Sequence, residues 1–445
     1  MSDSSTSTPA PPRETARPLA AAWPRAGTVE ARPASAAARA ARVDHLGTET
    51  VFAVAADAAA LAAKGKTVFP FHLGDLNIPT PANVAEAATR ALRAGRTTYC
   101  PNAGIPELRE AIALDVGRAR GLDYGVDNVS VQPGGKPVIG KFLLTMMNPG
   151  DEVLYPNPGF PIYSSLIEFF GGRAVPYTYV EGADRFWLDL DQIERLITPR
   201  TRLLILNDLH NPTGVECSAQ ELEALAALVR AHDLYVLCDE AYFDVRYQGA
   251  SASLTSLPGM QERCVILYTF SKKYAMTGWR LGAAIGPRWF IDTCNTLNVN
   301  GESCTNQFVQ WAGVEALTGD QSGARDILTT LERRRDVGLE ILNATAGVHC
   351  VKPDTTFYLY PNVTEAMART GHGGPGGYES FRRAVLEHTG VSMCTRLHFG
   401  PALPGETQRY LRFAYAGLHT DRIREGLGLL KAFIERQDRE LVPAP

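Results

Sequence analysis

Short apolar runs alternate with helical segments between about residues 128 and 286, and this alternation constrains the fold more than any other feature. Runs rich in Val, Ile, Leu and Tyr are typical of buried strands. Seven of them occur here: 128–131, 151–155, 173–176, 202–206, 234–238, 264–268 and 281–285. Because helical segments such as Ala219–Ala231 fall between most of these runs, the pattern predicts an α/β fold whose mainly parallel, seven-stranded sheet is covered by helices.

The segments outside this sheet predict a second, smaller domain. Helices are expected at 52–64 and 82–94, and one long helical stretch is expected at 307–343. Further strands are expected near 356–360 and 410–414. We therefore predict a large domain over residues 76–320. The smaller α/β domain would combine residues 46–75 with residues 321–445, so that both chain ends contribute to it.

The first 45 residues differ in composition from the rest of the chain, because Ser, Thr, Pro, Ala and Arg dominate them. Such a segment cannot bury enough apolar area to order itself, and it lacks the continuous apolar stretch of a secretory signal. Residues 1–45 are therefore expected to form a disordered arm that lies across a dimer partner. The protein itself is expected to be cytoplasmic. A targeting or docking tail is the alternative.

The overall composition excludes several classes of protein. The 445 residues carry a net charge of −4, with 45% hydrophobic and 21% charged residues, so no attraction to nucleic acid or to an anionic membrane is expected. No apolar run reaches the length of a membrane span. The eight cysteines include no Cys-x-x-Cys pair and the nine histidines are scattered, so neither a metal site nor a disulfide framework is expected.

Three segments in a fixed order carry the chemistry. Tyr268–Gly282 places Lys272 directly after a serine and eight residues before Arg280. Upstream lie the turn-like sequence His210–Gly214 and Asp239, which follows an apolar run. Taken singly, these segments are a turn, a strand end and a surface Ser-Lys pair. Together they describe a pocket for pyridoxal 5′-phosphate.

Each residue type suits one part of that cofactor. The pyridine nitrogen stays protonated only beside a carboxylate, which Asp239 would supply at the carboxyl end of a buried strand. The aldehyde needs an amine that is neutral part of the time, and a cationic ring near Lys272 would lower its pKa. Arg280 would clamp the phosphate through several hydrogen bonds.

A second phosphate contact is predicted near the first strand. Gly134, Gly135 and Lys136 follow the run 128–131 and open a predicted helix. Backbone N–H groups at a glycine-rich helix start bind phosphate well. A tight strand-to-helix turn without a ligand is the plainer interpretation.

These motifs resemble the fold-type I, class I and II aminotransferases, near the bacterial aspartate aminotransferase group. The likeness runs from about Val51 to about Lys431. It implies that Lys272 binds the cofactor aldehyde, whereas Lys273 stands at a variable position. The cofactor contacts that the resemblance implies are Tyr99, Gly134, Gly135, Lys136, Phe160, Asn211, Asp239, Tyr242, Thr269, Lys272 and Arg280.

The resemblance also gives these residues roles. Asn211 and Tyr242 would hydrogen-bond the phenolic oxygen, Thr269 would join Arg280 at the phosphate, and Phe160 would stack on the ring. Tyr99 would reach the phosphate of the neighbouring subunit in a homodimer. Gly74, Asn211 and Arg412 would bind the substrate, with Arg412 pairing bidentately with its α-carboxylate.

The predicted function is a pyridoxal phosphate-dependent aminotransferase that moves an amino group between an L-amino acid and a 2-oxo acid by a ping-pong mechanism. Lys272 would act as general base and then general acid, supported by Asp239 and Tyr242. Aspartate or glutamate as substrate follows from the resemblance alone. A lyase, oxidase or cyclase on the same scaffold is the alternative, because those reactions share the same frame.

Two other classes are disfavoured. A DNA-binding regulator would need a helix-turn-helix module that residues 1–45 lack. A structural protein without cofactor is disfavoured by the intact Lys272, Asp239 and Arg280.

Several segments depart from the family in the region of the substrate side chain. They are Gly74–Ile78, Thr355–Phe357 and Thr395–Arg396. Arg396 would bind either an acidic substrate side chain or merely a surface carboxylate. Glu49, Asn300 and Glu302 would border the pocket, which favours a polar or basic substrate.

Overall fold

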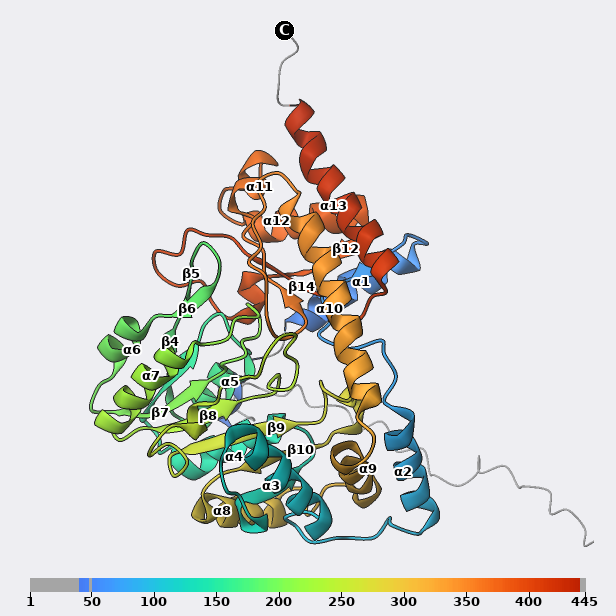
Figure 1. Ribbon diagram of the computed structural model, residues 1–445. Coiled ribbons are helices and arrows are strands. Elements are labelled where there is room, and N and C mark those ends of the chain that lie inside the picture. Colours follow the sequence, from blue (N-terminus) through green and yellow to red (C-terminus); the bar gives the residue numbers. More distant parts are fainter. Residues whose placement is uncertain (1–39, 48–49, 441–445) are drawn as a thin grey trace, which may run out of the picture.

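A seven-stranded sheet forms the centre of the computed structural model, which describes residues 40–47 and 50–440 (Figure 1). Its strands are β2 (Val129–Gln132), β3 (Glu152–Pro156), β4 (Arg173–Tyr177), β7 (Thr201–Leu206), β8 (Tyr235–Asp239), β9 (Cys264–Thr269) and β10 (Gly282–Ile285). The order across the sheet is β2-β10-β9-β8-β7-β3-β4. Within this sheet β10 runs opposite to the other six strands, which all point the same way. The sheet is therefore mainly parallel, and the predicted fold class is confirmed.

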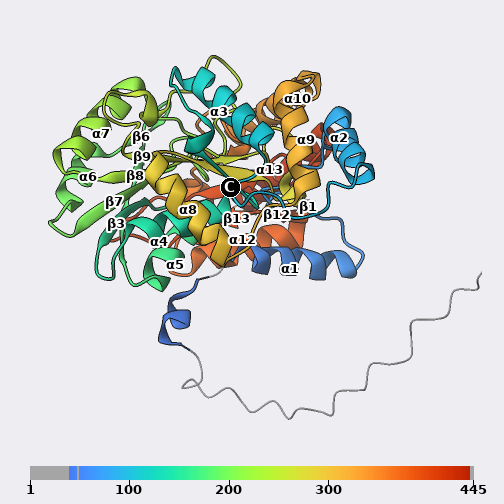
Figure 2. The same ribbon diagram turned by 90° about the horizontal axis from the view of Figure 1, so that it is seen from below.

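Helices cover both faces of the sheet, because alternate side chains of each strand point to opposite sides. On β7, Leu204 and Leu206 pack in one cluster and Leu203 and Ile205 in another. Figure 2 shows the two helical layers. One layer contains α3 (Pro106–Arg120), α7 (Ala219–Ala231) and α9 (Gln307–Thr318), and the other contains α4 (Lys136–Met146), α5 (Ile162–Phe169) and α8 (Arg288–Asn300).

Both ends of the described chain enter a second, smaller core. β1 (Phe69–Pro70) pairs in parallel with β12 (Val391–Ser392). Asp57 on α1 (Val51–Ala63) forms an ion pair of 2.5 Å with Arg382 on α12 (Gly377–Thr389). This core also contains the antiparallel sheet β11 (Tyr358–Leu359), β14 (Leu411–Ala414) and β13 (Cys394–Thr395), and the helices α10 (Ser322–Asn343), α11 (Thr364–Arg369) and α13 (Thr420–Glu440).

The structure corrects two details of the predicted elements. The single helical stretch expected at 307–343 is two helices, because Gly319 is extended at the end of α9 and α10 starts at Ser322. A Cβ at Gly319 would lie 2.7 Å from the carbonyl oxygen of Glu315. The pattern also missed the hairpin of β5 (Tyr179–Glu181) and β6 (Phe186–Leu188). The remaining helices are α2 (Ala82–Arg93), α6 (Leu190–Leu196) and the 3-10 turns Ala41–His45, Val126–Asn128, Leu254–Ser256, Thr277–Trp279 and Arg396–Phe399.

Most of the predicted arm, residues 1–39, lies outside the described residues. The described part of it, Ala41–His45, forms a 3-10 turn, and the N–H of Gly47 donates a 2.9 Å hydrogen bond to Ser165 on α5. The predicted domain limits, at residues 46–75, 76–320 and 321–445, stay a prediction. In the ranges 40–47 and 50–440, no helix combines the length and apolar character needed to cross a bilayer.

Candidate active site

A cavity of about 650 Å³ lies where the carboxyl ends of the parallel strands meet the smaller core. This edge of an α/β sheet is where ligands usually bind. Asp239 and Thr269 are the last residues of β8 and β9. The predicted site residues that line the cavity are Gly74, Gly135, Lys136, Phe160, Asn211, Asp239, Tyr242, Thr269, Lys272, Arg280 and Arg412.

Asp239 is a buried carboxylate with two hydrogen-bond donors. The hydroxyl of Tyr163 donates to Oδ2 at 2.5 Å, and the N–H of Ala241 donates to Oδ1 at 3.2 Å. Burial raises the pKa of Asp239 to about 6, although the hydroxyl of Tyr163, the N–H of Ala241 and the charge of Lys272 act in the opposite direction. A cationic ligand beside Asp239 would therefore lower this raised pKa and favour the ionised carboxylate.

The two adjacent lysines lie in different surroundings. Lys272 reaches into the cavity, where its Nζ donates to the carbonyl oxygen of Gly74 at 3.2 Å and lies 5.2 Å from the centre of the Phe357 ring. Lys273 instead forms an ion pair of 3.2 Å with Asp244. Burial alone would lower the pKa of Lys273, but the charge of Asp244 raises it above its usual value. Of these two lysines, Lys272 is therefore the one placed to react with a ligand in this cavity.

The residues predicted to contact phosphate gather at the start of α4. Gly135 precedes its first residue, Lys136, and Gly134 has a φ of 96°, in the left-handed region that favours glycine. A Cβ on Gly134 would lie 2.2 Å from Nη2 of Arg280. The glycine therefore allows the guanidinium to approach the backbone at the helix start. The hydroxyl of Thr269, at the end of β9, donates to Ser271 at 2.9 Å.

The opposite end of the cavity is held by Arg412 on β14. Its Nη2 donates to the carbonyl oxygen of His72 at 2.6 Å, and its Nη1 donates to Oδ1 of Asn211 at 3.3 Å. Its guanidinium lies over the rings of Tyr358 and Phe399, 4.5 and 4.6 Å from their centres. The hydroxyl of Tyr358 forms a 2.6 Å hydrogen bond with Tyr242. The predicted residues Asn211, Tyr242 and Arg412 are thus linked through one network.

Two predicted aromatic residues are placed differently. Phe160 lines the cavity, with Nζ of Lys136 lying 5.4 Å from its ring centre. Tyr99 is 87% exposed and does not line the cavity of its own chain. Its predicted contact with the phosphate of a neighbouring subunit stays a prediction.

The residues present fit pyridoxal phosphate. A carboxylate can accept more hydrogen bonds than the two that Asp239 receives, so it can also accept one from a ring nitrogen. The charged residues that line the cavity are Asp75, Lys136, Asp239, Lys272, Arg280 and Arg412. Since cations outnumber carboxylates in this lining, the cavity suits a ligand with a phosphate and a carboxylate.

Comparison with known proteins places this geometry in a family. The sequence family described as "Aminotransferase class I and II" matches residues 66–430, most of the chain. The chain belongs to the class I and II aminotransferases.

Named relatives agree with this membership of the aminotransferases. The aspartate/prephenate aminotransferase of Cereibacter sphaeroides is 35% identical, over 78% of this chain and 88% of that protein. The aspartate aminotransferase of Geobacillus stearothermophilus is 33% identical, over 81% of this chain and 91% of that protein. The solved structure of the Thermus thermophilus aspartate aminotransferase with maleate has a TM-score of 0.79 and 32% identity, covering 88% of this chain and 99% of that one.

Several predictions from the sequence are thereby confirmed. This aminotransferase has the expected fold type, its family uses pyridoxal phosphate, and its activity is transamination. The names of the relatives favour amino transfer over the elimination, oxidation or cyclisation that the sequence left open.

The sequence missed several residues that line the cavity of this aminotransferase. Tyr163 ends the conspicuous segment Pro156–Tyr163, and Ser271 directly precedes Lys272, so both stood within recognised motifs. Phe399 stood in the segment Leu397–Gly400, which follows Thr395–Arg396, but it was not chosen as a site residue. Tyr358 on β11 directly follows Thr355–Phe357 and was not chosen either.

Other predicted neighbours of the substrate lie elsewhere in the aminotransferase. Asn300 donates to the carbonyl oxygen of Thr296, and Glu302 pairs with Lys141. Neither of them lines the cavity of its own chain, which they were predicted to border. Glu49 lies outside the described residues. Arg396 pairs with the carboxylate of Glu406, as the alternative expected, but the pair is largely buried and not on the surface.

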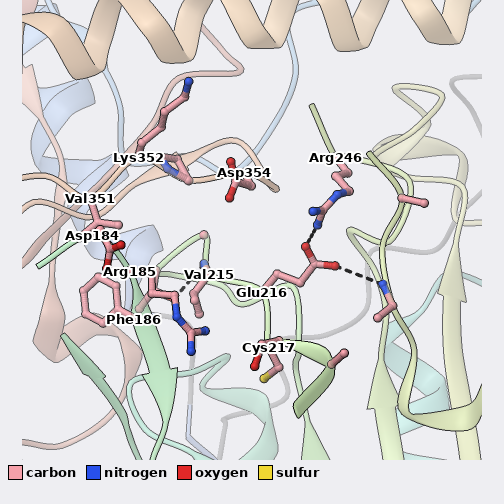
Figure 3. A pocket seen from close by; sticks show the side chains of 17 residues that line it. Asp184, Arg185, Phe186, Val215, Glu216, Cys217, Arg246, Val351, Lys352 and Asp354 are labelled. Carbon is pink, nitrogen blue, oxygen red and sulfur yellow. Dashed lines mark hydrogen bonds and ion pairs between the residues drawn. The ribbon is translucent and has the colours of Figure 1, made fainter. Parts of the chain in front are cut away.

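A separate cavity of about 380 Å³ borders residues 213–219, which follow Asn211 (Figure 3). Charged side chains surround it, and two of them contact each other: Arg246 forms an ion pair with Glu216, which also accepts a 3.2 Å hydrogen bond from the N–H of Ala252. None of the predicted site residues lines this second cavity. The chemistry of the aminotransferase therefore belongs to the larger cavity.

Proposed function

We propose that this chain is a homodimeric, cytoplasmic aminotransferase that moves the amino group of an L-amino acid of the aspartate or glutamate type to a 2-oxo acid. The observation that carries the proposal is that Lys272, Asp239 and Arg412 line one cavity, together with the phosphate-type site of Gly135 and Arg280. The names of the relatives, an aspartate/prephenate aminotransferase and an aspartate aminotransferase, support a donor of the aspartate type.

The residues would divide the work by position. When bound, pyridoxal phosphate supplies an aldehyde that joins to amines and a ring that withdraws electrons from the α-carbon of the substrate. Asp239 would hold the protonated ring nitrogen, fixed in turn by the hydroxyl of Tyr163. Gly134, Gly135, Thr269 and Arg280 would hold the phosphate, while Phe160, Asn211 and Tyr242 would fix the position of the ring.

Substrate binding and proton transfer would occur at the opposite side of the cavity. Arg412 would pair with the α-carboxylate through its planar guanidinium, beside Gly74. Nζ of Lys272 would accept the proton of the α-carbon and later return a proton, so that one amine acts as base and then as acid. The rings of Tyr358 and Phe399 would exclude water on the Arg412 side.

The reaction would run in two halves. The first would release a 2-oxo acid and leave the amino group on the enzyme, and a second 2-oxo acid would then take it up. The test is a single turnover: the purified holoenzyme receives one amino acid at a time, without any 2-oxo acid. One equivalent of the matching 2-oxo acid per active site is expected with aspartate or glutamate. Release of ammonia, or no oxo acid from any donor, would contradict amino transfer.

The homodimer has its own test, based on Tyr99. The mass of the holoenzyme in solution is expected to be twice that of the 48.3 kDa chain. If Tyr99 serves the neighbouring subunit, mixed dimers of a Tyr99→Ala chain and a Lys272→Ala chain contain one intact site and regain activity. Mixed dimers with no more activity per Lys272 site than the Tyr99→Ala parent would overturn the predicted role of Tyr99.

A further inference from the structure

The side chain of Arg396 is closed off from the cavity and bound at both ends within its own loop. The residue is 1% exposed and begins the 3-10 turn Arg396–Phe399, directly after β13. Its Nε lies 2.7 Å from Oε1 of Glu406, and its Nη1 donates to the carbonyl oxygen of Gly400 at 2.9 Å. The ion pair therefore joins the start of the loop to its far side.

The partner of Arg396 is held just as firmly. Oε2 of Glu406 accepts the N–H of Leu403 at 3.1 Å, and the N–H of Glu406 donates to the carbonyl oxygen of Leu403 at 3.1 Å. The N–H of Arg396 donates to the carbonyl oxygen of Tyr410, 3.0 Å away, next to β14. A buried charge costs much free energy when its partner is removed, so this pair strongly favours one shape of the loop.

That loop carries Phe399 to the cavity. The carbonyl oxygen of Phe399 accepts the N–H of Gly159 at 2.8 Å, and that of Pro401 accepts Nδ2 of Asn157 at 3.0 Å. Gly400 between them has a φ of 127°, and a Cβ there would lie 2.4 Å from Oδ1 of Asn157. The loop is thus docked against the segment that leads to Phe160, and Phe399 has little freedom.

The Phe399 ring in turn restrains Arg412. The guanidinium of Arg412 lies 4.6 Å from the centre of the Phe399 ring and 4.5 Å from the centre of the Tyr358 ring. Stacking on aromatic faces stabilises a guanidinium and fixes its plane. A bidentate pairing with a carboxylate requires that plane to be fixed, so the position of the ring affects substrate binding.

We propose that Arg396 and Glu406 form a latch that positions Phe399 on Arg412 and so sets the affinity for the α-carboxylate of the substrate. The proposal rests on the proposed carboxylate-binding role of Arg412. Arg396 is a positioning residue that never touches the substrate. Since every α-amino acid has the same α-carboxylate, loosening the latch weakens all donors to the same extent.

The test compares the latch with the ring that it positions. The holoenzyme variants are Arg396→Gln, Glu406→Gln, Phe399→Leu and the double variant Arg396→Gln/Phe399→Leu. Steady-state KM and kcat are measured for two donors. The Kd of α-aminoisobutyrate, which has an α-carboxylate but no α-proton, is measured from the change in absorption of the bound cofactor. Arg335→Gln is the matched control, because Arg335 is also 1% exposed and ion-paired, with Glu332, but does not line the cavity.

The expected result is a roughly tenfold rise in KM and in Kd for Arg396→Gln, with kcat within about twofold of the wild type. The double variant should bind no more weakly than Phe399→Leu, since Arg396 acts through that ring. Arg396→Lys, which keeps the charge, should fall between the wild type and Arg396→Gln. The control should leave KM and Kd unchanged.

Several outcomes would overturn the latch. They are an unchanged Kd in Arg396→Gln, a fall in kcat with KM unchanged, or effects of Arg396→Gln and Phe399→Leu that multiply. If Arg396→Gln does not fold, Arg396→Lys and Glu406→Gln give the same comparison. If the wild type binds α-aminoisobutyrate and yet transfers no amino group from any amino acid donor, the proposed function fails. In that case the Kd of α-aminoisobutyrate still decides whether the latch exists.

Discussion

The wall of the cavity that belongs to the large sheet and the wall that belongs to the smaller core hold their side chains by different means. Asp239 and Thr269 are the final residues of paired strands, so the backbone hydrogen bonds of the sheet fix them. On the other wall, Phe399 stands on a 3-10 turn, and it stacks on Arg412. Substitutions on the sheet wall should therefore change cofactor binding and chemistry, whereas those on the other wall should change substrate binding.

The largest effect is expected from Lys272→Ala on the sheet wall. Loss of the lysine proposed for both covalent binding and proton transfer should lower kcat at least about 10³-fold. The visible absorption of the lysine-bound cofactor should disappear as well. Lys273→Ala is the matched control, because its side chain pairs with Asp244 and does not line the cavity. Equal losses in the two variants would refute the assignment.

The next largest effect is expected from Arg412→Gln on the other wall. Removing a charge-assisted, bidentate partner should raise KM for the amino donor about 100-fold, with a much smaller change in kcat. The cofactor absorption should stay normal. Arg246→Gln removes the same charge beside the second cavity and should leave KM unchanged. A fall in kcat alone would break the division between the two walls.

The pH dependence of cofactor binding sharpens the comparison at Asp239. Its pKa in the cofactor-free protein is raised to about 6, and a cationic ring nitrogen requires the ionised form. Below pH 6 the carboxyl must lose a proton on binding, so the affinity should fall about tenfold between pH 7 and pH 5. Absorption titrations of the cofactor-free protein measure this, with Asp239→Asn as the comparison. The same pH dependence in both proteins would exclude Asp239 as its origin.

The smallest effect is expected from Tyr163→Phe, which removes one hydrogen bond to Asp239. Loss of a single such bond should reduce kcat about fivefold and weaken cofactor binding by a similar factor. Tyr177→Phe is a matched control, since that buried hydroxyl donates to the carbonyl oxygen of Ile205 at 2.9 Å, away from the cavity. If both variants behave alike, Tyr163 supports the fold rather than the carboxylate.

The sheet wall could be predicted from the sequence because each of its features depends on local pattern. Continuous apolar runs predicted the strands, and the position of Asp239 directly after one of them predicted it at the edge of the sheet. The turn-like motif His210–Gly214 predicted Asn211 through the resemblance to the family. Gly134 was recognisable because it and Gly135 follow a predicted strand and open a predicted helix.

The other wall could not be predicted in the same way. Phe399 and Tyr358 enter the cavity through contacts between segments far apart in the chain, and no periodicity records such contacts. Arg396 was correctly noticed as a departure from the family, but its partner Glu406 could not be chosen among the many acidic residues. Asn300 and Glu302 were misplaced for the same reason, because Lys141 fixes Glu302 elsewhere.

The pairing of β1 with β12 has a consequence for how the enzyme is made. Phe69 leaves the ribosome roughly 320 residues before its partner Val391, a delay on the order of tens of seconds during translation. The strands of the large sheet, up to Ile285, are all synthesised within that interval. A nascent chain can therefore assemble the sheet wall well before Arg412 exists. The ability to select a substrate is the last property that the growing chain acquires.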